Sequence, residues 1–167
     1  MKDQRNTTET NAIISRVMLP QDANPAGIVH GGVIMKGIDN AAGVAAVRYT
    51  RRICVTASID RLDVHNPCFI GNLITVKACV NMTGKTSMEI GVRVETEDLL
   101  AGTKAHLASA YLTFVALDGN NKPVGVPSLK RVTPEDIRRN KEAIARRKLR
   151  LAEKSNEKEC QSHTGKC

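Results

Sequence analysis

The chain has 167 residues, of which 41% are hydrophobic and 25% charged, as is typical of one globular domain that buries its own core. Its formal net charge of +8 favours an anionic partner: nucleic acid, a membrane surface or a phosphorylated small molecule. No apolar run approaches the ~20 residues that cross a bilayer, and the polar start differs from a secretory signal. We therefore expect a cytoplasmic protein without membrane insertion.

Cysteine and histidine spacing argues against a disulfide framework and against a metal site. The five cysteines are irregularly spaced and include no CxxC pair, which is typical of reduced thiols in a cytosol-like compartment. The four histidines are scattered without the spacing of metal ligands. We predict that the protein holds no metal.

The first part of the chain predicts one strand and one helix. Residues 1–11 are polar and expected to be disordered, and the apolar run 12–19 predicts a strand that ends at Pro20. A loop of turn-forming residues leads to a helix over 33–48, where Met35, Ile38 and Ala42 recur at helical spacing. Alanine and glycine fill most of its other positions, which is typical of a buried helix that its neighbours approach closely.

Downstream, the apolar residues recur with period two. This alternation predicts strands over 54–60, 74–82, 88–95 and 103–117, with turns at 66–72 and at the TGKT segment, 83–86. Half-buried strands joined by short turns indicate an antiparallel meander. One helix cannot cover both faces of such a sheet, so we expect an α+β fold in which the sheet curls around the 33–48 helix.

The last part of the chain predicts a basic helix outside the 12–132 domain. Residues 119–132 form a linker, and Thr133 and Pro134 are typical of a helix start. Ile137, Ile144 and Leu151 stand seven apart in an otherwise charged stretch. We expect this apolar seam to dock the helix on the outside of an oligomer, with its arginines left in solvent or near an anionic ligand. The last dozen residues are expected to be disordered.

A glycine pair, Gly31 and Gly32, stands at the start of the central helix. Taken alone, such a pair is most often a tight turn. It also allows a ligand to approach backbone N–H groups where the helix dipole is positive. That arrangement suits an oxyanion, because fixed donors stabilise charge as it develops.

Asp39 lies inside the same helix, although aspartate is a poor helix former and is disfavoured in apolar surroundings. It shares a helix face with Met35 and Ala42. If that face points into the molecule, Asp39 is either an interface or capping carboxylate or a general base or nucleophile. Asn24, in the preceding loop, is either a turn residue or an amide that orients a water molecule. Together with the glycine pair, Asp39 makes a candidate hydrolytic site.

The segment 83–87 has the composition of a phosphate-binding turn. An NTPase P-loop requires a glycine five positions before Gly84, where Cys79 stands, so we reject that motif. The segment is a hairpin turn between two strands. Its N–H groups, Lys85 and the hydroxyls of Thr86 and Ser87 are still able to hold a phosphate.

Three segments in combination closely resemble the hotdog-fold acyl-CoA thioesterases of the cytosolic acyl-CoA hydrolase family. They are the segment 19–50 with HGG and the helix aspartate, VTASID at 55–60 and GKTSMEI at 84–90, and the resemblance covers roughly residues 12–127. It implies a hotdog fold, with an antiparallel sheet wrapped around a long central helix. It also implies a homodimer in which the sheets of the two subunits form one continuous sheet, with active sites at the dimer interface. Three such dimers often assemble into a hexamer.

The resemblance further implies roles for individual residues. Asp39 activates water or attacks the thioester, and Asn24 of the opposite subunit helps to position the water. Gly31 and Gly32 supply the backbone donor to the carbonyl oxygen. The turn near the coenzyme A phosphates consists of Gly84, Lys85, Thr86 and Ser87. No further cofactor is implied, since coenzyme A is part of the substrate and product.

Hydrolysis of acyl-CoA to free fatty acid and CoA is the leading interpretation, and the positive charge fits the phosphates of CoA. A non-catalytic acyl-CoA-binding or lipid-binding regulator on the same fold would keep Lys85 without needing Asp39. A nucleic-acid-binding protein is suggested by the basic tail, but Tyr and Phe are too scarce for a stacking platform. We therefore expect acyl-CoA and further copies of the chain as partners, and no nucleic acid.

Overall fold

The computed structural model describes residues 4–6 and 10–164, without the side chains of residues 6, 61 and 158–164. Its elements, in chain order, are β1 (Gln4–Asn6), β2 (Ala12–Val17), the short 3-10 helix η1 (Pro20–Asp22), α1 (Gly31–Thr50), β3 (Ile53–Val64), β4 (Leu73–Thr83), β5 (Ser87–Asp98), β6 (Thr103–Leu117), β7 (Ser128–Lys130) and α2 (Pro134–Thr164).

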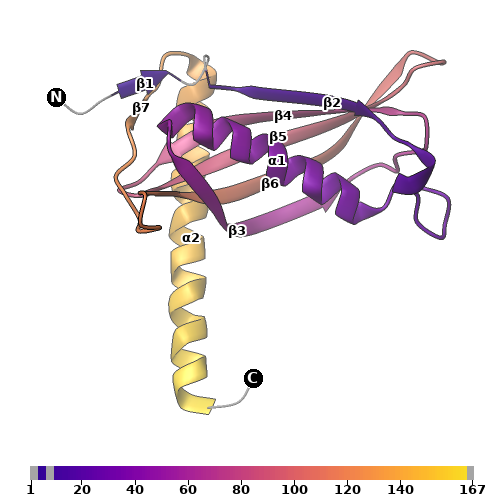
Figure 1. Cartoon of the computed structure of the whole chain (residues 1–167). Coiled ribbons are helices and arrows are strands. Elements are labelled where there is room, and N and C mark those ends of the chain that lie inside the picture. The colour runs from indigo at the N-terminus through magenta and orange to yellow at the C-terminus, as the bar shows by residue number, and fades with distance from the viewer. Residues whose placement is uncertain (1–3, 7–9, 165–167) are drawn as a thin grey trace.

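The main sheet has the strand order β2-β4-β5-β6-β3, and every neighbouring pair is antiparallel. It curls around α1, which lies along its inner face (Figure 1). All five predicted strands form, so the α+β architecture expected from the alternation is confirmed. β2 and β3 are the edges of the sheet, and their outer backbone groups have no strand partner in the part of the chain that is described.

α1 is buried because the side that meets the sheet carries small or apolar residues. Its buried positions are Ile34, Ile38, Ala41, Ala42, Ala45, Ala46, Tyr49 and Thr50. Short side chains allow the sheet to come close: a Cβ added to Gly37 would meet the Val76 side chain at 3.7 Å. The helix ends at Arg51, whose φ of 56° places it in the left-handed conformation typical of a C-cap.

The N-terminal segment is more ordered than the sequence indicates. Gln4–Asn6 forms β1, which pairs in parallel with β7 inside the predicted linker. Arg5 also donates to the carbonyl oxygen of Tyr49 at 2.8 Å and so satisfies an acceptor at the end of α1. The expectation of disorder over 1–11 is therefore wrong at 4–6, and at 1–3 and 7–9 it lies outside the described residues.

α2 crosses the outer face of the sheet, opposite α1, and then extends far beyond it (Figure 1). Within the single chain the predicted apolar seam does not dock it, because Ile137, Ile144 and Leu151 remain 53–58% exposed. The side that meets the sheet is polar instead, as described below. α2 continues to Thr164, so the expected disorder of the last dozen residues is wrong up to that point. No helix within the described ranges has the length and apolarity to cross a bilayer.

Candidate active site

The loop before α1 is held in place by a buried carboxylate, Asp22. Arg16 donates to both oxygens of Asp22 at 2.6 and 2.5 Å, and the Leu19 N–H donates at 2.9 Å. These donors, the Leu19 N–H first and then Arg16, lower the pKa of the Asp22 carboxyl below its ordinary value. The Asp22 carbonyl in turn accepts the His30 N–H at 2.8 Å, so this residue positions the whole segment that carries Asn24 and the start of α1.

Asn24 is a turn residue whose side-chain oxygen is hydrogen-bonded inside the loop and whose side-chain nitrogen is not. Its Oδ1 accepts the N–H groups of Ala26 at 2.9 Å and Ile28 at 3.3 Å, around a turn in which Gly27 has a φ of +77°. The side-chain oxygen is therefore used inside the loop. Nothing among the described residues accepts from Nδ2, so Asn24 offers N–H donors, and no acceptor, to a water molecule or substrate.

The two glycines at the start of α1 are not equivalent. His30 is the N-cap, and its Nδ1 accepts the Gly32 N–H at 2.9 Å. A Cβ on Gly32 would lie 3.1 Å from that nitrogen, so a glycine suits this cap. The Gly31 N–H has no acceptor within the described chain, and it is the donor that remains available at the positive end of α1. Sequence reasoning missed His30 as the cap, although the residue directly before a helix is where a cap is expected.

Asp39 faces the β3 edge of the sheet and not the core. It is half-buried, and the Thr56 hydroxyl on β3 donates to its Oδ1 at 2.6 Å. On the same helix face, Met35 is 43% exposed and Ala42 is fully buried, so this face, whose orientation the sequence left open, is only partly buried.

Sequence reasoning missed Thr56. No local signal identified it, because the apolar residues Val55 and Ile59 marked the other face of this strand as the inner one. In the structure both are exposed, and Thr56 pairs with the buried Phe114 and so points inward toward α1.

The single chain does not bring all the predicted groups together. Gly31 and Asp39 are eight residues apart on one helix, which separates them by about 12 Å along its axis. No hydrogen bond joins Asn24 to Asp39 among the residues described. Apolar side chains are exposed on α1 and on the edge strand β3, and Met35 among them shares a helix face with Asp39. We call this set the apolar border: Met35, Val44, Val47, Ile53, Val55 and Ile59.

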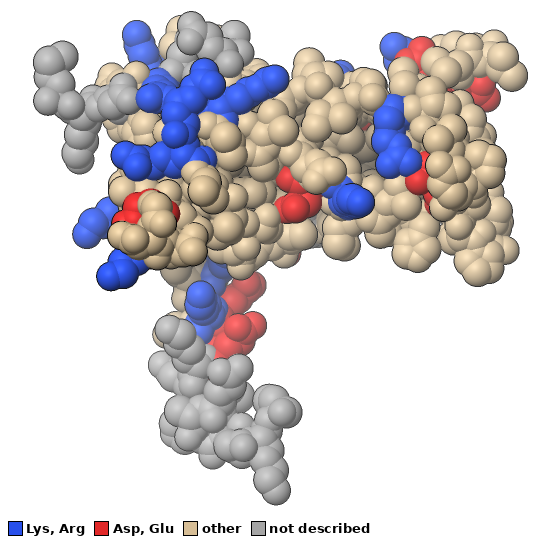
Figure 2. All heavy atoms as spheres, in the orientation of Figure 1, with Lys and Arg blue, Asp and Glu red and all other residues tan. Residues whose placement is uncertain are grey.

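A second, basic hollow lies at the other end of α1, around the 84–87 turn. The Gly84 N–H donates to the Ser87 carbonyl at 2.7 Å, which confirms the hairpin turn. The hollow has a volume of about 640 Å³, and its cationic lining residues are Arg5, Arg52 and Lys85. No Asp or Glu is among the described residues that line it. Lys and Arg side chains gather over the end of the molecule where β1 and β7 lie (Figure 2).

Comparison with known proteins agrees with this geometry. A family model described as the thioesterase superfamily matches residues 26–102. A Bacillus subtilis protein named as an uncharacterized acyl-CoA thioester hydrolase is 35% identical over 144 residues, which cover 86% of this chain and 84% of that protein. Protein VdlD of Helicobacter pylori is 35% identical over 141 residues, which cover 84% of this chain and 80% of its own.

Solved structures give the same result. An apo-hexameric acyl-CoA thioesterase superposes with a TM-score of 0.88 at 33% identity, covering 90% of this chain and 97% of that one. A Staphylococcus aureus acyl-CoA hydrolase with an asparagine replaced by alanine, in complex with coenzyme A, superposes with a TM-score of 0.92 at 28% identity over 100% of both chains.

Two further structures of that hydrolase have an aspartate or a threonine replaced by alanine. The replaced aspartate follows the replaced asparagine by 15 positions, and the threonine follows the aspartate by 17. Asn24, Asp39 and Thr56 have the same two spacings in this chain.

Proposed function

The chain belongs to the thioesterase superfamily and is an acyl-CoA thioester hydrolase, and from that premise we propose that Asp39 directs the attack of water on the thioester carbonyl. The observation that carries the proposal is the 2.6 Å hydrogen bond from Thr56 to Asp39 Oδ1 on a half-buried helix face. The bond orients the carboxylate and uses one of its two oxygens. Oδ2 remains to take a proton from water.

Hydrolysis then proceeds by addition and elimination. The water oxygen, held by the N–H groups of Asn24 Nδ2, bonds to the thioester carbon while Asp39 takes a proton. The carbonyl oxygen becomes an oxyanion and accepts the Gly31 N–H, which the Gly32–His30 cap holds in place. On collapse the C–S bond breaks, the sulfur keeps the electron pair, and the thiolate takes the proton from Asp39. The products are free fatty acid and CoA.

Two copies of the chain complete each site. A single carbonyl cannot reach both Gly31 and Asp39 of one helix across about 12 Å. A second copy that pairs at the open β3 edge would bury the apolar border beside Asp39 and bring in its own Gly31 and Asn24. We propose this homodimer as the active unit, and three such dimers as the hexamer, because a hexameric acyl-CoA thioesterase is among the structural neighbours.

The basic hollow is proposed to hold the phosphates of CoA through Lys85, Arg5 and Arg52. Lys85 acts there as a point charge, and the turn that carries it is completed by Gly84, Thr86 and Ser87. The pantetheine arm from the thioester carbon to the first phosphorus has about fourteen bonds, and its extended length is roughly 16 Å. From Asp39 to Thr50, which lines the hollow, α1 rises by about the same distance.

Thiol release from acyl-CoAs, from acetyl to palmitoyl, tests the proposal. Asp39→Ala is expected to lower kcat about 10²-fold or more, as for the loss of a positioned base, while CoA binding and the circular dichroism spectrum stay unchanged. Thr56→Val should lower kcat less, and Thr103→Val, an exposed threonine of β6, serves as its control. Near-normal turnover by Asp39→Ala would contradict the assignment. Failure of the unchanged protein to release thiol from any acyl-CoA would favour the non-catalytic binding protein.

Mixing two inactive variants tests whether the site is shared. A dimer that exchanges subunits between Asn24→Ala and Asp39→Ala chains contains one site with both groups intact. Activity should therefore return in the mixture. No recovery, despite exchange demonstrated by mass, would place both residues in one subunit's site.

We further propose a cytoplasmic location. A rat relative named cytosolic acyl coenzyme A thioester hydrolase, 36% identical over 76% of this chain and 34% of its own length, supports it.

A further inference from the structure

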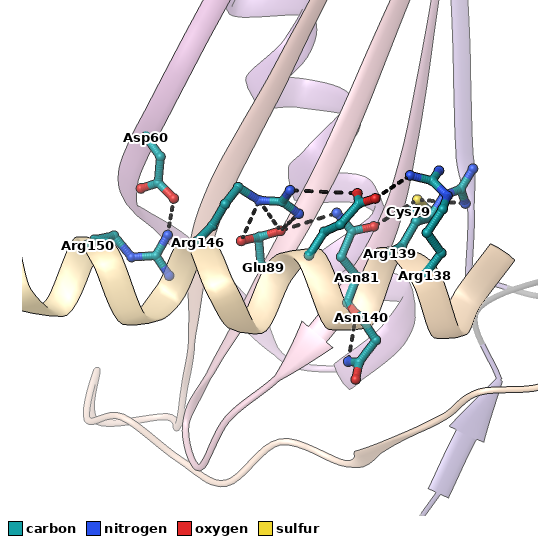
Figure 3. Close-up of polar contacts among 10 residues, drawn as sticks. Asp60, Cys79, Asn81, Glu89, Arg138, Arg139, Asn140, Arg146 and Arg150 are labelled. Atoms are coloured by element: carbon teal, nitrogen blue, oxygen red, sulfur yellow. Dashed lines mark hydrogen bonds and ion pairs between the residues drawn. The ribbon is translucent and has the colours of Figure 1, made fainter. Parts of the chain in front are cut away.

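α2 crosses the sheet strand by strand toward the β3 edge. Along the helix, Arg139 donates to Cys79 Sγ of β4 at 3.3 Å, and Arg146 pairs with Glu89 of β5 at 2.7 Å. Arg150 then pairs with Asp60 of β3. The contacted residues, shown in Figure 3, belong to β4, β5 and β3, which follow one another in that order across the sheet with β6 between β5 and β3. The direction of α2 is therefore set from its N-terminal end to the open edge.

The centre of this contact is buried and specific. Glu89 has no exposed surface, and it accepts from Arg146 at 2.7 Å and from Asn81 Nδ2 at 3.3 Å. The Arg146 guanidinium also stacks 3.6 Å above the centre of the Tyr111 ring on β6. A charge pair with so many partners allows little freedom in the angle at which α2 leaves the sheet.

Beyond Arg150, α2 has no sheet beneath it in this chain. Fourteen residues, 151–164, continue the helix for about 21 Å past the last strand. Every side chain that the structure describes in this overhang, 151–157, is exposed. An isolated helix of this length is marginal in water, so the overhang needs a surface on which to pack.

We infer that this overhang docks on the outer face of a second copy of the chain, whose β3 pairs with β3 of the first. The inference rests on the β3-edged homodimer proposed above. In that dimer the β3 of the second copy is the next strand of the continuous sheet, about 4.8 Å beyond the β3 of the first. A helix that already points across that edge then runs over the neighbour's sheet.

Charge complementarity supports the same occupant. Lys154 stands one turn after Arg150 and so on the same face of α2, about 6 Å farther along, or close to one strand spacing. The outer face of β3 carries Asp60, which contacts Arg150, and Asp63, which pairs in register with Ser109. Arg150 thus meets a carboxylate of its own β3, and Lys154 is placed to meet one on the β3 of the second copy.

Zero-length carbodiimide cross-linking of the full chain tests the inference directly, because it joins a lysine amine to a carboxylate only on contact. In a mixture of ¹⁵N-labelled and unlabelled protein, we expect a peptide containing Lys154 joined to a β3 peptide of the other isotope. Lys154→Arg keeps the charge and should lose this link while it remains a dimer. A link within one isotope only, or to another segment, or no link in a protein that is dimeric by sedimentation, overturns the docking and leaves the dimer standing.

A matched pair of charge reversals gives an independent measurement. Lys154→Glu should raise the dimer dissociation constant up to about 25-fold, because the symmetric dimer loses two ion pairs and about fivefold is the upper range for each exposed pair. The difference should shrink at high salt. Lys148→Glu, an exposed lysine of the same helix over the first copy, should leave the constant unchanged. Equal effects of the two reversals would overturn the inference. A full chain that sediments as a monomer would instead contradict the proposed dimer.

Discussion

The two long helices lie on opposite faces of one sheet and are held there by different forces. α1 buries small and apolar side chains, and its one carboxylate, Asp39, stands at the border next to β3. α2 meets the sheet through Arg139, Asn140, Arg146 and Arg150, while its isoleucines remain exposed. The inner helix is attached by burial, which has no direction, and the outer helix by polar contacts, which have one.

This difference has a consequence for the effect of mutation. Removal of a methyl group from the α1 contact leaves a small cavity that neighbours can partly fill. Removal of one partner from the α2 contact leaves a buried polar group without its counterpart, which costs more than the interaction itself contributes. α1 is therefore suited to carry a reacting group, whereas α2 is suited to keep a fixed orientation relative to the sheet.

Loss of the central charge pair should have the largest effect on stability. Arg146→Ala leaves the fully buried Glu89 carboxylate without its cation, and we expect a loss of about 3 kcal/mol in the free energy of unfolding. Urea unfolding followed by circular dichroism measures it. Arg138→Ala is the control, because its partners Glu135 and Glu142 are solvent-exposed. Its free energy of unfolding should be close to that of the unchanged protein. Equal losses would show that the Arg146 pair does not hold α2.

The same glycine-to-alanine substitution should have opposite signs on the two sides of the sheet. In Gly91→Ala, the new Cβ would lie 2.4 Å from Asn81 Nδ2 beneath α2, so that amide must move, at a cost of about 2 kcal/mol. In Gly37→Ala, the nearest atom is at 3.7 Å, and higher helix propensity should stabilise the protein by about 0.5 kcal/mol. Thermal unfolding of both variants measures the difference, and the same sign in both would contradict it.

Lys85 tests whether the basic hollow belongs to the substrate site. Lys85→Ala should raise the KM for acyl-CoA about tenfold with little change in kcat, as expected when uniform binding is lost. A short thioester without the nucleotide should be unaffected, and Lys148→Ala, on the exposed side of α2, is the matched control. Equal damage with both substrates would show that the turn supports the fold or the reacting centre.

The smallest effect concerns the pH dependence of the loop that leads into α1. The Leu19 N–H and Arg16 lower the pKa of Asp22 in the folded chain, so the unfolded chain binds more protons below the ordinary carboxyl range. Stability from Asp22 is present at neutral pH and is lost as the pH falls. Asp22→Asn should be less stable at pH 7, and its curve should approach that of the unchanged protein in acid. Parallel curves from pH 7 to pH 3 would contradict this.

The fold could be predicted where one residue pattern decides one structure. Alternation from Ile74 onward placed the long strands, and the small residues of α1 indicated a helix that is closely wrapped. The same alternation gives a wrong prediction at Glu89. Its place between the apolar residues Met88 and Ile90 predicts a side chain that faces solvent. It is fully buried, because α2, more than forty residues later, covers it. A pattern along a strand indicates which face a residue lies on, and not what lies above that face.

The sequence by itself indicated the five strands of the main sheet and the wrapped central helix, because apolar periodicity acts within a few residues. The group of Asn24, Gly31, Gly32 and Asp39 followed from the resemblance to hotdog-fold thioesterases. Only the tertiary structure decided that Thr56 hydrogen-bonds to Asp39 and that α2 docks by its arginines. Each of these contacts joins residues that are far apart in the sequence and that folding brings together. The apolar seam of α2 was the local pattern that predicted its docking, but the buried Glu89 carboxylate required a cation more strongly than Ile137, Ile144 and Leu151 required burial.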